Sequence, residues 1–442
     1  VINIESELTG SEKIGVWRAG RGIFTKNYGK FNDDDPTTRF YSQNVPDYEV
    51  DSVNTSDGLE GDLFCYNNAL NWSYVVQLSI DTRMQQTFTL YDNWTAASNG
   101  SYATAFGTDG YYWYGGLRVN SGANVKLNLN GYTLDRALTS ARDYGWAIRV
   151  DSNAKLEIVD ELLDTERTTK GTITGGKNSR ADYQSAGAIM VYSNGELTLN
   201  GGLITGNVGN MGAVSIYSAR INLGGSVSIK DNKTNSNVNS NLYLQTEANY
   251  IGITSKLTGG DPIGVTHKAF GALTRGYGQS GNAADPATVF ISEDVDYGVR
   301  AMGEGDELEA ETFTFKASIA WEHAIKTSLA NGGRAELCTL YQDWTAAYDG
   351  SYRTAFGYDG TYYYYGSLYV PTGAHVILDL NGHTVNRNIT GSAYSRGYVF
   401  YVNGTLEIND TSKDIETNED GSKHEEGKIT GGNCSNAGAA YV

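Results

Sequence analysis

Residues 339–380 read TLYQDWTAAYDGSYRTAFGYDGTYYYYGSLYVPTGAHVILDL, and this stretch is a second copy of an earlier segment. Residues 89–129 read TLYDNWTAASNGSYATAFGTDGYYWYGGLRVNSGANVKLNL. Trp94 and Trp344 lie 250 positions apart, and the spacing becomes 251 after one insertion in the tyrosine run. A duplication of this length identifies a tandem repeat, and the rest of the chain is interpreted from it.

The similarity extends well beyond this segment. Residues 14–16 (IGV) match residues 263–265 (IGV), and residues 1–191 run alongside residues 250–442. The chain therefore holds about one and three-quarter units of a repeat. We expect it to be a piece of a longer polypeptide, with the tail of one unit (1–66), a complete unit (67–315) and the first part of the next unit (316–442).

The composition indicates a folded, acidic and turn-rich protein. The 442 residues include 54 glycines, 32 tyrosines and 7 tryptophans but only 5 prolines, and so many aromatic side chains are not typical of a disordered chain. The net charge of −18 argues against nucleic acid as a partner, because phosphate binding needs a basic surface. Acidic side chains can collect Ca²⁺, which is the one cofactor that we leave open. No run of about 18 apolar residues predicts a membrane span.

A short helix is predicted at the start of each unit. Trp321, Ala324, Ile325 and Leu329 follow the i, i+3, i+4, i+8 spacing of one helical face. In the first copy Trp72 begins the same face. We expect this helix to cover the open end of a β core.

After the helix, apolar and polar residues alternate in short runs that end at glycine or asparagine. Residues 125–129 (VKLNL) and 376–380 (VILDL) show this pattern, which is typical of strands with one buried face. A finer repeat of 23 to 25 residues relates residues 186–207 to residues 212–232. Two or three short strands per step favour a parallel β-helix over a sandwich or a series of hairpins. The sequence thus predicts an all-β chain of parallel β-helix (solenoid) units in tandem, each with a short capping helix and a small β linker module.

Two segments depart from this rhythm. Residues 160–185 are polar, and we expect them to loop out. Residues 250–311 contain isolated strands and an acidic patch, and we expect them to form the linker module that closes one β-helix and joins it to the next unit.

Several motifs resemble the repetitive β-helix surface proteins of Gram-positive bacteria. They are VILDLNGHTV at 376–385, its copy VKLNLNGYTL at 125–134, and the pair GKITGG and GTITGG at 427–432 and 171–176. The resemblance covers nearly the whole chain. It implies a right-handed β-helix like that of pectate lyases, an extracellular location at the cell surface, and an adhesin-like role without an assigned ligand. The tyrosine-rich insertion departs from the common pattern of these proteins.

Recurrence between the copies tests each candidate for catalysis. Sugar hydrolysis needs a pair of carboxylates, and a lyase needs acidic Ca²⁺ ligands and a base. Glu157/Glu407 and Asp160/Asp410 recur, and each is isolated from other recurring acids. No histidine or cysteine has a counterpart of its own type in the other copy: His267, His323, His375, His383, His424, Cys65, Cys338 and Cys434. We therefore expect no enzyme, no disulfide or metal site in the repeating unit, and no catalytic residue.

The tyrosine run is the candidate contact surface. Four consecutive aromatic residues cannot all face inward on a strand, so we expect about half of them to be exposed. Exposed flat rings stack on sugars or on another protein. The alternative is that the rings pack against the neighbouring coil, the helix or the next unit. The residues are Tyr111, Tyr112, Trp113 and Tyr114, with Tyr362, Tyr363, Tyr364 and Tyr365 in the second copy.

Three functions follow from these observations. The first is a structural repeat segment of a giant extracellular fibre or filament, whose units or chains associate with one another and so hide their sheet edges. The second is an adhesin that binds a glycan or a host surface through the exposed tyrosines. The third is a polysaccharide lyase or hydrolase with a site confined to one copy.

Overall fold

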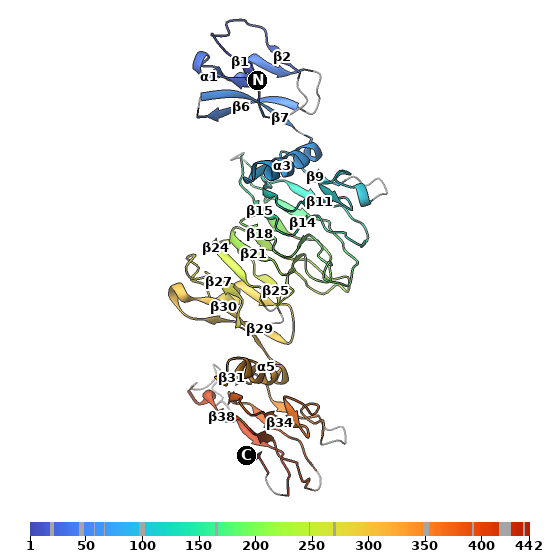
Figure 1. The fold of residues 1–442 in the computed structure, drawn as a ribbon, viewed down its shortest axis with the longest axis vertical. Coiled ribbons are helices and arrows are strands. Elements are labelled where there is room, and N and C mark those ends of the chain that lie inside the picture. The colour runs from blue at the N-terminus through green and yellow to red at the C-terminus, as the bar shows by residue number, and fades with distance from the viewer. Residues whose placement is uncertain are drawn as a thin grey trace. The chain divides into compact units, whose positions relative to one another are not determined.

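The computed structural model describes residues 1–442 apart from 18–21, 44–47, 57, 66, 97–101, 164–166, 247, 268–270, 348–352, 391–392, 415–425 and 436–437. The chain is mostly β, and most of its strands pair in parallel (Figure 1). It divides into two compact structural units, which we call the first unit and the second unit. The first holds residues 1–268, 272–293 and 301–310, and the second holds residues 269–271, 294–300 and 311–442.

Three sheets form the main part of the first unit. Sheet I has the order β10 (Tyr112–Trp113), β11 (Gly116–Val119), β14 (Ile148–Val150), β17 (Ile189–Val191), β20 (Val214–Ile216), β23 (Leu242–Leu244), β25 (Ile263–His267) and β28 (Phe290–Ser292). Sheet II has the order β27 (Thr274–Arg275), β24 (Ile251–Leu257), β21 (Arg220–Gly225), β18 (Glu196–Leu199), β15 (Lys155–Val159), β12 (Asn124–Asn128) and β8 (Gln86–Thr89). Sheet III has the order β22 (Ser228–Ile229), β19 (Leu203–Ile204), β16 (Thr172–Thr174), β13 (Thr133–Asp135) and β9 (Trp94–Thr95).

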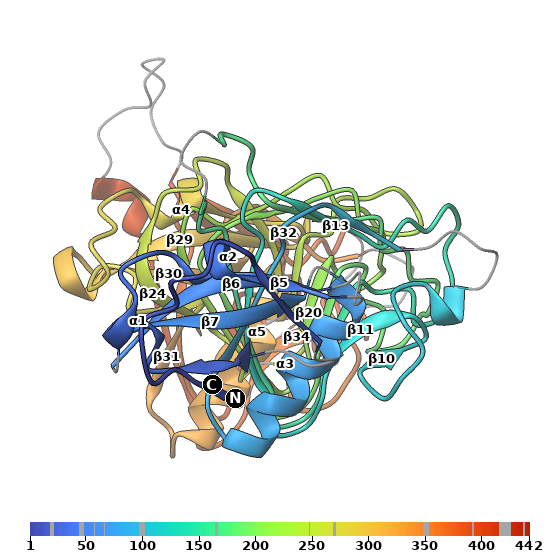
Figure 2. The same cartoon turned by 90° about the horizontal axis from the view of Figure 1, so that it is seen from above.

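From β12 to β23 the chain visits sheets II, III and I in turn, and every visit adds a strand beside the previous one. We call three consecutive strands, one from each sheet, a step. All neighbours in the three sheets pair in parallel except β10 and β11, which are antiparallel. These two strands lie together at the side of the unit in the view from above (Figure 2).

Apolar side chains form columns that cross the strands. In sheet I the register aligns Leu117, Ile148, Ile189, Val214 and Leu242, and all five are buried. Side chains alternate between the two faces of a strand, so parallel strands in register place their apolar residues in one layer. The predicted two-residue period and its buried face are therefore confirmed.

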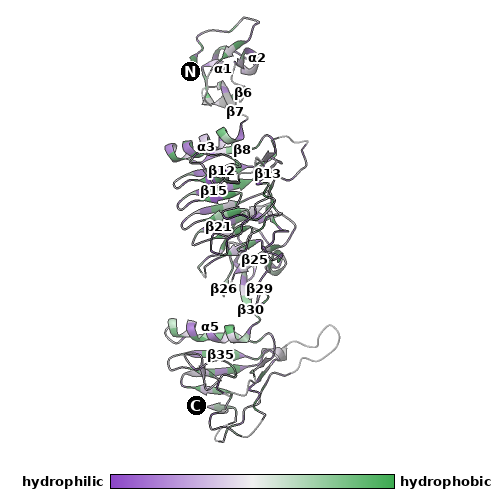
Figure 3. Ribbon diagram, turned by 90° about the vertical axis from the view of Figure 1, so that its right-hand side faces the viewer, coloured by the Kyte–Doolittle hydropathy of each residue, from purple (hydrophilic) through white to green (hydrophobic). Residues whose placement is uncertain are grey.

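The two predicted helices are present as α3 (Asn68–Thr82) and α5 (Ala317–Ala330), and both carry hydrophobic as well as hydrophilic residues (Figure 3). The side chain of Asn67 accepts hydrogen bonds from the first-turn amides of α3, which fixes where that helix begins. The prediction for Leu329 was wrong, because its side chain is exposed. Ser328 lies on the buried face instead, and its hydroxyl bonds Arg334 O and His375 N.

The linker module occurs twice. Its first copy comprises β1 (Ile2–Asn3), β2 (Ile14–Val16), β3 (Gly22–Ile23), β4 (Thr25–Lys26), α1 (Tyr28–Phe31), α2 (Pro36–Arg39), β5 (Phe40–Ser42), β6 (Tyr48–Thr55) and β7 (Gly58–Cys65). Its second copy comprises β24, β25, β27 and β28 with β26 (Gly271–Ala272), α4 (Pro286–Val289), β29 (Tyr297–Met302) and β30 (Glu309–Thr314). Matching hydrogen bonds join Thr25 Oγ1 to Glu60 and Thr274 Oγ1 to Glu309, both at 2.6 Å.

Two expectations for the irregular segments need correction. The strands after residue 250 are not isolated, because β24 pairs with β21 and β25 pairs with β23. Residues 160–185 do not loop out as a whole, because β16 lies in sheet III between β13 and β19. Both errors have the same cause. The paired strands are 20 to 40 residues apart in the sequence, and in such polar segments no local pattern of apolar residues shows which strands pair.

The second unit repeats the first three-sheet arrangement. Its sheets have the orders β31 (Ala335–Thr339), β35 (His375–Asp379), β38 (Thr405–Asn409); β32 (Trp344–Thr345), β36 (Thr384–Asn386), β39 (Lys428–Thr430); and β33 (Tyr363–Tyr364), β34 (Ser367–Val370), β37 (Phe400–Val402), β40 (Ala440–Tyr441). Single 3-10 turns complete the chain at Tyr102–Thr104, Gly305–Glu307 and Thr411–Asp414.

Buried asparagines form a hydrogen-bonded column in the first unit. Asn207 Nδ2 donates to Asn232 at 3.1 Å, and Asn232 Nδ2 donates to Asn241 at 2.9 Å. The column ends on a carboxylate, because the amide and Nδ2 of Asn241 donate to the two oxygens of Glu293 at 2.7 and 2.6 Å. Burial raises the pKa of Glu293 above its ordinary value, although both bonds from Asn241 and the charge of Lys233 oppose the rise.

This raised pKa predicts a pH-dependent stability. The unfolded chain releases the Glu293 proton near its ordinary pKa of about 4.3, whereas the folded chain holds the proton to a higher pH. Glu293 should therefore make the first unit less stable as the pH rises through this window. Urea unfolding of the native chain and of Glu293→Gln between about pH 4 and pH 7 measures the effect. The difference in unfolding free energy between the native chain and Glu293→Gln should change over this pH range. A difference that stays constant would contradict a raised pKa of Glu293 in the folded chain.

Candidate functional site

The second aromatic residue of each tyrosine run belongs to the core. Tyr112 and Tyr363 start the antiparallel pairs β10–β11 and β33–β34, and both side chains are buried. Tyr112 donates its hydroxyl to Ala69 O at 2.8 Å, and Tyr363 donates to Glu322 at 3.0 Å. Burial raises the pKa of both phenols. Because Ala69 and Glu322 belong to α3 and α5, these two tyrosines face a helix and cannot form part of a contact surface.

A tryptophan of each helix fixes the backbone of the tyrosine run. Trp72 Nε1 donates to Tyr111 O at 3.3 Å, and Trp321 Nε1 donates to Tyr362 O at 3.1 Å. Both indoles are fully buried. The side chain of Tyr111 also hydrogen-bonds Gln77 of α3. The run is thus attached to the helix that precedes it, as the packing alternative expected.

A buried arginine holds the other end of each run, and the sequence reasoning missed it. Arg136 Nη2 donates to Tyr114 O at 2.7 Å, and Arg387 Nη2 donates to Tyr365 O at 2.9 Å. Tyr114 and Tyr365 have left-handed backbones, with φ of 47° and 49°, so their carbonyls turn toward the arginines. Burial lowers the pKa of Arg387 to about 10. The sequence did contain a signal for this arginine. Arg136 and Arg387 lie 251 positions apart, so the residue recurs in both copies, and both side chains are buried.

The remaining aromatic residues of the first run join a surface that we call the aromatic–arginine face. Tyr111 and Trp113 are half-buried, and Tyr114 is 41% exposed. The Tyr114 ring stacks on Tyr144 with centroids 4.6 Å apart, and the Arg149 guanidinium lies 4.5 Å from the ring centroids of both Trp113 and Tyr192. The face consists of Trp113, Tyr114, Tyr144, Arg149, Arg180 and Tyr192.

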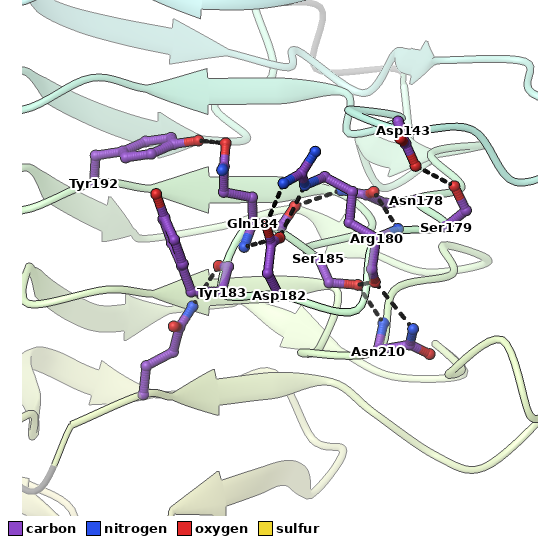
Figure 4. Close-up of polar contacts among 11 residues, drawn as sticks. Asp143, Asn178, Ser179, Arg180, Asp182, Tyr183, Gln184, Ser185, Tyr192 and Asn210 are labelled. Atoms are coloured by element: carbon purple, nitrogen blue, oxygen red, sulfur yellow. Dashed lines mark hydrogen bonds and ion pairs between the residues drawn. The ribbon is translucent and has the colours of Figure 1, made fainter.

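The loop before β17 completes this face with polar groups (Figure 4). The guanidinium of Arg180 lies 4.6 Å from the Tyr144 ring centroid and forms an ion pair with Asp182. Gln184 accepts the hydroxyl of Tyr192 at 2.6 Å. Asn178 Nδ2 donates to the carbonyls of Gln184 and Ala186, which holds the loop against the buried strands. These polar groups are thus bonded mainly to one another.

The second unit has the same kind of surface with different residues. Tyr369, Tyr401 and Tyr441 are in register on β34, β37 and β40, and Tyr401 and Tyr441 stack with centroids 5.4 Å apart. Tyr364 stacks near Tyr401 at 4.5 Å, and the Arg396 guanidinium lies 3.9 Å from the Tyr365 ring. Tyr362, Tyr364 and Tyr365 are half-buried. Both copies therefore stack aromatic rings and guanidinium groups against one another, but an arginine in one copy takes the position that an aromatic residue has in the other.

Two hollows of moderate size lie among the described residues, one in each unit. A hollow of about 300 Å³ in the first unit is lined by Arg220, Asn222, Asn249 and Tyr250, among others. A hollow of about 330 Å³ in the second unit is lined by residues that include Arg300, Glu311, His323 and Tyr341. Arg300 is paired with Glu311 at 2.9 Å, and Asn249 Nδ2 donates to Ala219 O at 2.9 Å. The second hollow is lined by two carboxylates: Glu311, which pairs with Arg300, and Glu336, which accepts Asn331 Nδ2 at 3.0 Å.

The recurring acids have structural partners. Asp160 accepts the amides of Gly131 and Gly171 at 2.7 and 2.6 Å, and Asp410 accepts those of Gly382 and Gly427 at 2.8 and 2.7 Å. Among the residues that the structure describes, no three histidine, cysteine or acidic side chains gather as a metal site, Ca²⁺ included. His424 lies outside the described residues.

His375 lies 2.6 Å from Glu407, the recurring acid on β38, and His383 lies 3.7 Å from Asp343. No described helix is long and apolar enough to cross a membrane. Comparison of the chain with family models, curated proteins and solved structures finds no match.

Proposed function

We propose that the chain is a structural repeat segment of a giant extracellular fibre at the cell surface. In this proposal the successive steps of each unit form a right-handed parallel β-helix, and the units follow one another in tandem. The handedness and the location come from the resemblance of the NG and ITGG motifs to repetitive bacterial surface proteins. The parallel register from step to step supports the β-helix.

One observation carries the structural role: the residues that hold the tyrosine run in place recur in both copies and are buried. Trp72 and Trp321 hold the tyrosine run, and the arginines at 136 and 387 hold its far end. Other surface groups differ between the copies, since Arg149 and Tyr401 occupy equivalent outward positions. A duplicated binding or catalytic site would require the same surface groups twice, whereas a building unit requires only the same core.

Immunogold electron microscopy of the producing cells tests this function. Antibodies raised against the chain should label extended material outside the cell envelope. Label confined to the cell interior, or label on compact secreted particles, would contradict the fibre. A crystal structure of the chain would separately test the β-helix, since left-handed or antiparallel connections between the steps would exclude it.

Glycan binding is the second candidate, and the exposed rings favour it. Tyr114 and Tyr183 are both about two-fifths exposed, and Tyr183 stacks on Tyr217 with centroids 4.6 Å apart. Flat rings of this kind stack on sugar rings. A glycan array would show binding that Tyr114→Ala and Tyr183→Ala together abolish. Binding that survives the double substitution would remove this face from consideration.

A further inference from the structure

The hollow of about 300 Å³ in the first unit lies where three consecutive turns lead from sheet I to sheet II. The turns occupy residues 192–195, 217–219 and 245–250, of which 247 lies outside the described residues. The strands on both sides of these turns are in register. The middle turn is the shortest, so it is recessed between its neighbours, and residues of all three turns line the hollow. We call this place the corner hollow.

Hydrogen bonds fix the floor and both walls of the corner hollow. The amide of Asn194 donates to Ser218 O at 3.0 Å, which joins the first turn to the middle turn. Asn249 is buried, and its Nδ2 donates to Ala219 O at 2.9 Å. Its Oδ1 accepts the amide and the hydroxyl of Thr246 at 3.0 and 2.8 Å. A site whose walls are held in this way loses little conformational freedom when a ligand binds.

Polar groups at the corner hollow are available to a ligand. The side chains of Asn194, Ser218 and Arg220 have no hydrogen-bond or ion-pair partner within the described part of the chain, and all three residues are exposed. Arg220 lies in register beside Glu196, but the Glu196 carboxylate pairs with Lys155 at 3.1 Å instead. The donors of the Arg220 guanidinium therefore remain open at the edge of the hollow.

The charge at the corner hollow is opposite to that of the whole protein. The chain has a net charge of −18, yet Arg220 is the single charged residue among the described residues that line the hollow. A second guanidinium, that of Arg275, lies 3.8 Å from the ring centroid of Tyr250, which also lines the hollow. A guanidinium binds a carboxylate through two parallel hydrogen bonds. These groups therefore favour a ligand that carries a carboxylate.

We propose that the corner hollow binds the terminal residue of a glycan when that residue carries a carboxylate. Arg220 holds the carboxylate, Asn194 and Ser218 hydrogen-bond the sugar hydroxyls, and the half-buried Tyr250 ring lies against the sugar. A volume of about 300 Å³ is at the lower end of small-ligand sites, which suits a single sugar residue. This site is separate from the aromatic–arginine face, and it does not rest on the fibre role.

Ligand-observed NMR with the full chain tests the ligand class. A methyl glucuronide and the matching methyl glucoside differ only in a carboxylate that replaces a hydroxymethyl group. The chain should bind the glucuronide about tenfold more tightly, because hydrogen bonds to a charged group are the stronger ones. The methyl glycoside of N-acetylneuraminic acid is the second acidic sugar. Binding of either acid supports the proposal, and the comparison of the two identifies which kind of acidic sugar the site prefers.

Substitutions at Arg220 test the position of the site. Arg220→Gln should weaken binding of the acidic sugar about tenfold. Arg220→Lys should weaken it less, because the charge stays while the two parallel hydrogen bonds are lost. Arg142→Gln is the matched control, since Arg142 is an exposed arginine of the first unit that does not line the hollow, and this variant should bind like the native chain.

Three results would overturn the inference: no binding of either acidic sugar, equal binding of the glucoside and the glucuronide, or unchanged affinity in Arg220→Gln. Circular dichroism of Arg220→Gln should match that of the native chain, because the side chain is exposed, so lost binding is distinguished from lost folding. The double variant Tyr114→Ala, Tyr183→Ala should keep the binding, and a loss there would place the ligand on the aromatic–arginine face instead. The fibre proposal is tested separately, on cells.

Discussion

Replacing Trp321 with alanine should destabilise the second unit by about 3–5 kcal/mol, the usual cost of removing a fully buried tryptophan. The indole is 0% exposed, and its ring lies 6.4 Å from the Trp344 ring and 6.3 Å from the Phe400 ring. Its Nε1 also donates to Tyr362 O at 3.1 Å. The substitution thus opens a cavity below α5 and removes one of two donors to Tyr362 O, which keeps the amide of Tyr369 at 3.0 Å.

The same change at Trp72 should destabilise the first unit for the same reason. Its ring meets Phe88 edge to face at 5.4 Å. Trp17→Ala is the matched control, because Trp17 is 79% exposed and its loss should change stability by less than about 0.5 kcal/mol.

Hydrogen exchange is the suitable measurement, since two units need not unfold in a single transition. Amides of α5 and of the tyrosine run should lose protection in Trp321→Ala and keep it in Trp17→Ala. Equal protection in the two variants would show that the helix does not hold the run.

The second large effect is expected at the recurring aspartates. Asp160→Ala removes the carboxylate that accepts the amides of Gly131 and Gly171 at 2.7 and 2.6 Å. Charged hydrogen bonds are the stronger ones, and two donors would lose their acceptor at once. We expect a loss of about 2–4 kcal/mol in the first unit, with Leu163 and Thr169 released from their hydrogen bonds to the Asn130-Gly131 turn.

Limited proteolysis detects this release. Asp160→Ala should be cut within residues 161–170 faster than the native chain, at a protease concentration that leaves the rest intact. Glu161→Ala is the control, because that side chain is 61% exposed and pairs with Lys126 at the surface. Equal cutting of the two variants would mean that Asp160 does not hold the loop. Asp410→Ala tests the same bond pattern in the second unit, where Ser412 adds a third donor at 2.7 Å.

Asp379 in the VILDL strand and Asn128 in the VKLNL strand are both buried, although the residue type differs between the copies. Asp379 faces Asn128 in the repeat, so the acid is present in one copy only. In the structure Asp379 accepts the amides of Asn381 and Thr411, and Asn128 accepts those of Asn130 and Glu161. Either side chain supplies the acceptor that the turn requires, so the two residues exchange without loss of the fold.

The sequence by itself determined the local elements. A helix at Ala317–Ala330 follows from apolar residues at helical spacing, and strands such as Asn124–Asn128 follow from alternation and from the glycines and asparagines that end them. The repeat also separated residues that both copies need from residues that only one copy has. These signals are contained within a few turns or strands of the chain, so they can be found without knowledge of the packing.

Only the tertiary structure decided which side chains the neighbouring elements cover. Tyr112 and Tyr363 stood in a run of which about half was expected at the surface, and in each copy a helix that begins about 45 residues earlier covers this tyrosine. Ile2 and Ile251 occupy the same place in two copies of one module; Ile251 lies between β21 and β27 and is buried, whereas Ile2 pairs with β4 and is 41% exposed. Burial depends on which distant strand or helix lies alongside, and that pairing is fixed by register across the sheets rather than by the residues next to each position.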